Sequence, residues 1–192
     1  MQELKERIVK EGKVLPGNII KVDGFLNHRI DTGLLTRIAE EFGKYFNMDE
    51  VTMVLTAEAS GIALATAVAT YFHKPMIFAK KAKSDNIEGG LYQSDIYSYT
   101  YKKKVTLLVS KEWLSSDDKV LIIDDFMANG EAMRGLCDIV TAAGATLLGI
   151  GCAVEKGFQG GGDRLRAAGV NLKSLAIIES AEPGNIVFRD DG

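Results

Sequence analysis

The chain has 192 residues, which suits one domain with a substantial core, and its net charge is −3 at pH 7. A weakly acidic chain argues against a general nucleic-acid or membrane-surface binder, because such proteins are usually basic. The N-terminal segment lacks the apolar core of a signal peptide, and the longest weakly polar run, residues 61–72, is too short to cross a bilayer. Cys137 and Cys152 lie among apolar neighbours, which favours buried free thiols and a cytoplasmic location.

The N-terminal residues predict two amphipathic helices separated by a β-ribbon. Residues 2–11 alternate apolar and charged side chains with the spacing of a helix that has one apolar face. Residues 18–22 are typical of a strand, Asp23-Gly24 of a hairpin turn and residues 25–30 of the returning strand. A second amphipathic helix begins near Asp31. Because this ribbon precedes the regular alternation of strands and helices, it is a candidate small subdomain.

From residue 51 onward, short apolar runs typical of buried strands alternate with helical segments. The expected strands are residues 51–56, 76–79, 105–109, 119–125, 146–154 and 172–178, and the expected helices are residues 62–72, 131–143 and 159–168. A polar loop, residues 80–90, and an extended segment, residues 91–101, interrupt this order. The alternation predicts an α/β fold with a central, mostly parallel sheet flanked by helices. Ligands of such sheets bind at the carboxyl ends of the strands.

The chain is organised around residues 119–132. This stretch begins as an uninterrupted apolar run, which predicts a strand buried on both faces, and the run ends on Asp124 and Asp125. The small residues 128–130 then open a helix, whose first N–H groups and positive dipole end suit a phosphate. Two carboxylates beside a phosphate site make sense if the ligand also carries vicinal hydroxyls. The stretch therefore predicts a site for a ribose phosphate.

Four apolar residues, two acidic ones, a loop of small residues and a helix resemble the 5-phosphoribosyl-1-pyrophosphate (PRPP) motif of type I phosphoribosyltransferases. An ordinary buried strand followed by a capped helix is the simplest alternative. Response-regulator receivers also carry an acidic pair, but theirs follows the first strand of the domain, whereas Asp124 and Asp125 lie in the second half of this chain. The resemblance implies the type I phosphoribosyltransferase fold with a small hood subdomain.

Beyond the motif, the whole chain resembles the xanthine phosphoribosyltransferases, a family of bacterial purine-salvage enzymes. The matching segments are residues 4–8, Leu15, Asn27-His28, Thr56, 58–62, 121–126, 128–130, Glu155-Lys156 and 158–160. The family implies one phosphoribosyltransferase domain over residues 1–192, with a hood formed partly by about residues 1–30 and a mobile lid at about residues 80–100. It also implies a cytoplasmic homodimer that uses Mg²⁺ to convert xanthine and PRPP into xanthosine 5′-monophosphate (XMP) and pyrophosphate.

The same resemblance implies roles for individual residues. The catalytic pair that holds the ribose hydroxyls would be Asp124 and Asp125. The PRPP-binding residues would be Ala128, Asn129, Gly130, Glu131 and Ala132, and the pyrophosphate loop would be Ala57, Glu58, Ala59, Ser60 and Gly61. Xanthine would contact Ile20, Asn27 and Lys156, with either Phe126 or Phe158 stacked on its ring. Mg²⁺ would be held mainly by PRPP and water rather than by a protein metal site.

The sequence leaves the proton acceptor for the base open. Hypoxanthine–guanine phosphoribosyltransferases place an acidic residue at the position of Ala128, so a carboxylate is missing there. Xanthine is more acidic than other purines and can ionise unaided. Alternatively, a group of the expected lid, Glu88 or Tyr92, accepts the proton.

Three other functions remain open on this fold. Adenine phosphoribosyltransferases usually carry Glu-x-Arg-Gly where this chain has residues 58–61, and Ser60 together with Lys156 favours an oxopurine. Turnover of hypoxanthine or guanine is the second alternative. The third is a non-catalytic PRPP-sensing regulator, although residues 1–50 carry no winged-helix pattern.

Overall fold

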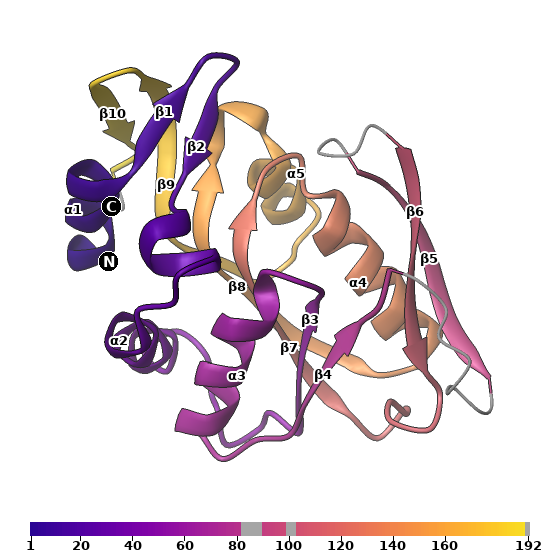
Figure 1. Ribbon diagram of the computed structural model, residues 1–192. Helices are drawn as coiled ribbons and strands as arrows, with labels where there is room; N and C mark the ends of the chain where they lie inside the picture. Colours follow the sequence, from indigo (N-terminus) through magenta and orange to yellow (C-terminus); the bar gives the residue numbers. More distant parts are fainter. Residues whose placement is uncertain (82–89, 99–102, 191–192) are drawn as a thin grey trace.

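The computed structural model describes residues 1–81, 90–98 and 103–190 (Figure 1). Its helices are α1 (Gln2–Glu11), the π-helix η1 (Asp23–Asn27), α2 (Thr32–Phe42), α3 (Gly61–Tyr71), α4 (Glu131–Ala142), the 3₁₀ turn η2 (Gly157–Gln159) and α5 (Gly161–Ala167). Its strands are β1 (Lys13–Leu15), β2 (Ile19–Lys21), β3 (Met53–Ala57), β4 (Met76–Ala79), β5 (Leu91–Ser98), β6 (Lys103–Ser110), β7 (Lys119–Met127), β8 (Thr146–Lys156), β9 (Leu172–Glu182) and β10 (Asn185–Phe188).

A six-stranded sheet forms the centre of the molecule, in the order β10-β9-β8-β7-β3-β4. Strands β4, β3, β7, β8 and β9 of this sheet are parallel to one another, and the edge strand β10 pairs antiparallel with β9. Helices α2 and α3 lie on one side of the sheet and α4 on the other (Figure 1). This arrangement confirms the predicted α/β class with its mostly parallel sheet.

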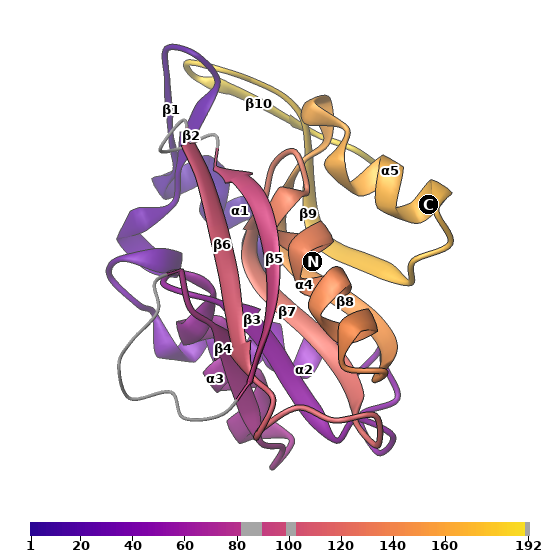
Figure 2. The ribbon, with the colours of Figure 1, turned by 90° about the vertical axis from the view of Figure 1, so that its right-hand side faces the viewer.

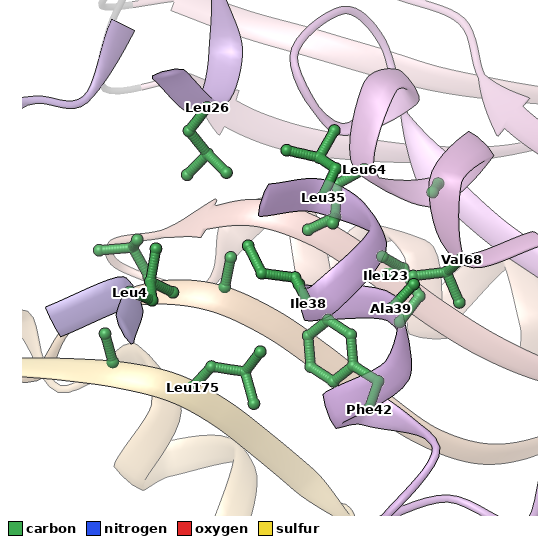
Figure 3. Close-up of a cluster of buried hydrophobic side chains, with 14 of the residues drawn as sticks. Leu4, Leu26, Leu35, Ile38, Ala39, Phe42, Leu64, Val68, Ile123 and Leu175 are labelled. Carbon is green, nitrogen blue, oxygen red and sulfur yellow. The ribbon is translucent and has the colours of Figure 1, made fainter. Parts of the chain in front are cut away.

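Strand β7 is buried on both faces, as its uninterrupted apolar run predicts. Leu121 and Ile123 pack into a core cluster with α1, α2 and α3, part of which is drawn in Figure 3. Val120 and Ile122 point to the opposite face and pack with α4. Burying such a side chain fully contributes about 1.5–3 kcal/mol, so the two clusters hold β7 firmly in the middle of the sheet.

The predicted strand at residues 105–109 exists, but it does not join the central sheet. It belongs to β6, which pairs antiparallel with β5 in a separate two-stranded ribbon beside α4 (Figure 2). Ile96 and Leu107 of this ribbon are buried against α4. A bridge between Lys80 and Leu108 ties the ribbon to the end of β4. Within the expected lid at residues 80–100, residues 91–98 form the regular strand β5. Residues 82–89 and 99–100 lie outside the described residues.

An N-terminal ribbon is present, but the predicted pairing of residues 18–22 with residues 25–30 is wrong. Strands β1 and β2 pair antiparallel around residues 16–18, where Gly17 and Asn18 adopt positive φ angles. The Asp23-Gly24 step instead begins the π-helix η1. Phe25 and Leu26 are both fully buried, and a strand that alternates its side chains between two faces cannot bury consecutive residues in one core. Core packing therefore overrides the hairpin signal at Asp23-Gly24.

The sequence reasoning missed strand β10. Glu182-Pro183-Gly184-Asn185 forms the hairpin turn between β9 and β10, with Gly184 at a φ of 82°. The Pro-Gly step is a usable turn signal, but the following strand has only four residues. Such a short segment carries too little periodicity to be recognised.

Both cysteines are free, as predicted, and Cys152 is buried, whereas Cys137 is only half-buried. Burial raises the pKa of the Cys137 thiol to about 11, so this thiol is protonated at neutral pH. Along the described residues, no helix combines the length and apolarity needed to cross a membrane.

Candidate active site

A cavity of about 370 Å³ opens at the carboxyl ends of β3, β7 and β8, within the size range of small-molecule sites. Nearly all predicted site residues line it. They are Ile20, Asn27, Ala57, Glu58, Ser60, Asp124, Asp125, residues 128–132 and Lys156. The two exceptions are Ala59 and Gly61, which belong to the same loop as Glu58. Segments from five separate parts of the chain thus meet at one edge of the sheet, as the rule for parallel sheets predicts.

The acidic pair is almost completely buried at the base of this cavity, with Asp124 6% and Asp125 1% exposed. The Asn27 Nδ2 donates a hydrogen bond to the Asp125 Oδ2 at 2.9 Å, which connects η1 to β7. Burial raises the pKa of Asp124 well above its usual range, and the negative charge of Asp125 raises it further. The pair therefore stores repulsion that a ligand carrying hydrogen-bond donors or positive charge relieves.

Asp124→Asn is expected to stabilise the ligand-free protein at neutral pH. Because the native pKa is raised, the native state binds more protons than the unfolded state above pH ~4, and the carboxyl costs stability as the pH rises. The melting temperature of the variant should exceed that of the wild type by ~2–4 °C at pH 7, the shift expected for ~1 kcal/mol. Thermal denaturation from pH 4 to pH 8 with a chelator present measures this difference. A difference that shrinks with rising pH would contradict the prediction.

The loop between β7 and α4 keeps its backbone accessible. Gly130 adopts a left-handed conformation, with φ of 79°, and precedes the first turn of α4. Within the described residues, no side chain caps this helix N-terminus. Residues 128–132 all line the cavity. The N–H groups of this turn and the positive end of the helix dipole therefore face a space that suits a phosphate.

The loop between β3 and α3 approaches the acidic pair closely. The peptide bond between Glu58 and Ala59 is cis, and Ser60 precedes α3 without capping it through its side chain among the described contacts. A methyl group at Gly61 would overlap the Thr56 Oγ1 and the Asp124 Oδ1. Glycine at position 61 thus allows the start of α3 to lie directly beside Asp124.

Lys156 is the last residue of β8 and also lines the cavity. Its ammonium donates to the Asn18 carbonyl oxygen at 3.1 Å and lies 5.4 Å from the centre of the Phe126 ring. Burial lowers its pKa from the usual value. A flat aromatic face and a partly desolvated cation, with Ile20 nearby in the cavity lining, form a pocket for a planar ring that carries a carbonyl oxygen.

Comparison with known proteins places this arrangement in a family. Residues 28–168 match the family model described as the phosphoribosyl transferase domain. The chain is 52% identical to xanthine phosphoribosyltransferase from Lachnoclostridium phytofermentans, over 100% of both chains. It is 52% identical to the Bifidobacterium longum enzyme of the same name, over 98% of this chain and 100% of that one. The chain belongs to the phosphoribosyltransferase family.

Solved structures support the fold of this phosphoribosyltransferase. Adenine phosphoribosyltransferase from Giardia lamblia superposes with a TM-score of 0.77, at 20% identity, over 93% of this chain and 98% of that one. The Saccharomyces cerevisiae enzyme superposes with a TM-score of 0.74, at 18% identity, over 91% and 97% of the two chains. At these identities the likeness concerns the fold alone. It confirms the predicted type I phosphoribosyltransferase fold.

The sequence left open which phenylalanine stacks on the base and which side chain accepts the proton of the base. Phe126 and Phe158 are both half-buried and both pack against the core cluster of α1, α2 and α3, but only Phe126 belongs to the described lining of the cavity of this phosphoribosyltransferase. Tyr92 is outside the described lining of the cavity, and the Lys111 ammonium lies 5.1 Å from its ring centre. Glu88, the other candidate proton acceptor, lies outside the described residues.

Sequence reasoning missed Lys81 and Tyr97, which also line the cavity. The positive charge of Lys81 partly offsets the raised pKa of Asp124, and its backbone N–H donates to the Glu58 Oε1 at 2.5 Å. Lys81 was recognisable, because it lies two residues beyond the carboxyl end of the parallel strand β4. Tyr97 was not, because it enters the cavity from the β5–β6 ribbon outside the central sheet.

The described residues contain no cluster of three or more His, Cys, Asp or Glu side chains that could hold a metal ion. Four carboxylates, those of Glu58, Asp124, Asp125 and Glu131, nevertheless line the cavity of this phosphoribosyltransferase. Oxygen ligands of this kind suit Mg²⁺, which keeps several waters and commonly shares its ligands with a phosphorylated substrate.

Proposed function

We propose that this protein converts xanthine and PRPP into XMP and pyrophosphate, a purine-salvage reaction. One observation carries the proposal. A single cavity combines an uncapped helix N-terminus, a buried carboxylate pair and a lysine above an aromatic ring, in a chain 52% identical over its whole length to a xanthine phosphoribosyltransferase. These three groups match the phosphate, the ribose and the oxopurine of the two substrates.

Residues 128–132, which we call the phosphate cradle, and the acidic pair of Asp124 and Asp125 account for PRPP. The 5′-phosphate would lie on residues 128–132, where backbone N–H groups and the dipole of α4 favour an anion. Asp124 and Asp125 would accept hydrogen bonds from the ribose 2- and 3-hydroxyls. Pyrophosphate would lie against residues 57–61 at the start of α3. Glu58 and the acidic pair are the residues that would share Mg²⁺ with PRPP, and the bound ion supplies neutralisation of the pyrophosphate charge.

Bond cleavage at the anomeric carbon develops positive charge on the ribose ring, so the residues act by placement rather than by covalent attack. Asp124 and Asp125 are buried, and with the ribose hydroxyls bound to them this charge would form beside them. Their mutual repulsion in the free protein is relieved as the ring becomes cationic. The acidic pair therefore interacts more strongly with the transition state than with the ground state, which is the condition for catalysis.

The base would stack on Phe126, under Ile20, with Lys156 donating to a carbonyl oxygen of xanthine. Asn27 would contact the base while its amide also reaches Asp125. The N-terminal residues to about position 30, which supply Ile20 and Asn27, would thus act as the hood. We further infer a lid within residues 80–100 that covers the sugar from water, a homodimeric assembly and a cytoplasmic location.

An activity assay tests the proposed reaction. The protein, PRPP and Mg²⁺ are incubated separately with xanthine, guanine, hypoxanthine or adenine, and nucleotide formation is followed. Xanthine should have the highest kcat/KM. Preference for adenine would keep the mechanism and overturn the base assignment. Measurable PRPP binding without turnover of any base would favour a PRPP-sensing regulator instead.

Lys156→Ala is expected to weaken xanthine more than hypoxanthine or guanine. If Lys156 donates to the 2-oxo group, which those two purines lack, its loss should lower kcat/KM for xanthine about tenfold beyond any change for them. Steady-state kinetics with the three bases measures the ratio. Lys173→Ala, which removes a lysine stacked on Tyr45, is the control. An equal loss for all three bases would contradict the role of Lys156.

A further inference from the structure

Helix α5 supports the phosphate cradle from behind. The start of α5 packs so closely on the cradle that a methyl group at Gly161 would overlap the Ala128 carbonyl oxygen and the Gly130 nitrogen. From the same helix, the Arg164 Nη2 donates a hydrogen bond to the Asn129 carbonyl oxygen at 3.0 Å. Three consecutive cradle residues are therefore held by one helix that lies outside the cavity.

Helix α5 is itself fixed to the sheet by buried charge. The Arg166 guanidinium makes two hydrogen bonds, of 2.6 and 3.1 Å, to the carboxylate of Glu155, which is fully buried at the end of β8. Ser174 of β9 donates to the same carboxylate. A side chain at Gly162 would overlap the Glu155 carboxylate, so glycine there allows the close approach of α5.

A second ion pair restrains the same helix. Asp163 accepts hydrogen bonds of 2.6 and 3.0 Å from the Arg189 guanidinium. Arg189 also donates to Glu179 of β9 at 2.7 Å. Strands β8 and β9 thus define the place of α5, and α5 in turn defines the place of the cradle.

We propose that Arg164 is a positioning residue for the 5′-phosphate of PRPP, an inference that rests on the proposed placement of this phosphate on residues 128–132. Residues 128–130 of the cradle are small and Gly130 is left-handed, so the shape of this turn depends on outside contacts. The Asn129 carbonyl and the Gly130 N–H belong to one peptide group. A cation on that carbonyl polarises the peptide and makes the N–H a stronger donor toward the phosphate. Holding the loop also removes the cost of ordering it on binding.

Arg164→Met tests this role. The KM for PRPP and the Kd for ribose 5-phosphate should both rise about tenfold, the loss expected for one charge-assisted hydrogen bond, while kcat changes less than about twofold. The Kd for pyrophosphate should not change, because residues 57–61 lie on another loop. Arg164→Lys should restore part of the ribose 5-phosphate affinity. Equal weakening of ribose 5-phosphate and pyrophosphate would indicate general damage and overturn the inference.

Two further variants separate this inference from the proposed function. Arg37→Met removes an exposed arginine that pairs with Glu3, and it should leave all three constants unchanged. Ala132→Asp places a carboxylate in the first turn of α4 and should abolish ribose 5-phosphate binding. If Ala132→Asp acts but Arg164→Met does not, the inference fails and the phosphate assignment stands. If neither variant weakens ribose 5-phosphate, the assignment of residues 128–132 fails, and the role of Arg164 fails with it.

Discussion

Asp125→Asn is expected to lower kcat by about 10²–10³-fold, the range observed when one preorganised electrostatic group is removed from an active site. Asp125 is 1% exposed and accepts the Asn27 amide at 2.9 Å. Asparagine has nearly the same shape, so the fold should persist. It carries no charge to stabilise the cationic ribose, and its NH2 group, a donor, replaces one of the two acceptor oxygens of the carboxylate. Steady-state kinetics with xanthine and PRPP measures the loss.

The matched control for Asp125→Asn is Asp117→Asn, which changes an exposed carboxylate outside the cavity lining. This variant should keep kcat within about twofold of the wild type. The melting temperature of Asp125→Asn should be at least that of the wild type, because the substitution removes the repulsion from Asp124. A folded Asp125→Asn protein with near-normal kcat would remove Asp125 from the catalytic pair.

Arg166→Met is expected to have the largest effect on stability, about 3–5 kcal/mol of unfolding free energy. The Glu155 carboxylate is fully buried, and Arg166 supplies two of its hydrogen bonds. Truncating the arginine leaves the buried Glu155 carboxylate without its cation. Nothing then offsets the free-energy cost of removing that carboxylate from water. Urea denaturation followed by circular dichroism measures the change.

The contrast for Arg166→Met is Arg37→Met, whose salt bridge with Glu3 is solvent-exposed on both sides. Exposed pairs contribute about 0–1 kcal/mol, so the control should lose no more than that. Adding Glu155→Gln to Arg166→Met should recover part of the stability, because a neutral amide costs less to bury than a carboxylate. If Arg166→Met loses less than about 1 kcal/mol, Glu155 does not depend on Arg166 for its burial.

The central site was predictable because its chemistry is local in sequence. Residues 119–132 encode in one run a doubly buried strand, an acidic pair and an uncapped helix start, and each of these depends on neighbouring residues alone. The loop at 57–61 and Lys156 were predictable for a different reason. Parallel strands place their carboxyl ends at one edge of a sheet, so the residue that follows each strand marks the site even when the strands are far apart in the chain.

Other features depended on contacts that no local pattern contains. Core packing of Phe25 and Leu26 replaced the expected hairpin at Asp23-Gly24 with a helical turn. Strand β6 has an apolar run like those of the central strands. It nevertheless pairs with β5, because α4 provides a second apolar surface against which both β5 and β6 pack. The preference for Phe126 over Phe158 likewise follows from the cavity, because both rings pack against the same core cluster and only Phe126 belongs to the described cavity lining.

The sequence by itself determined the fold class, the position of the acidic pair and the turn of residues 128–130 before α4, because hydrophobic periodicity and turn preferences depend on a few neighbouring residues. Tertiary structure alone decided which side chains hold residues 128–132 in place. Arg164 contacts Asn129 and Arg166 contacts Glu155 across long stretches of chain, and a charged side chain looks the same in sequence whether it meets water or a buried carboxylate. Burial and pairing of charges are properties of the folded chain, since both depend on segments that only folding brings together.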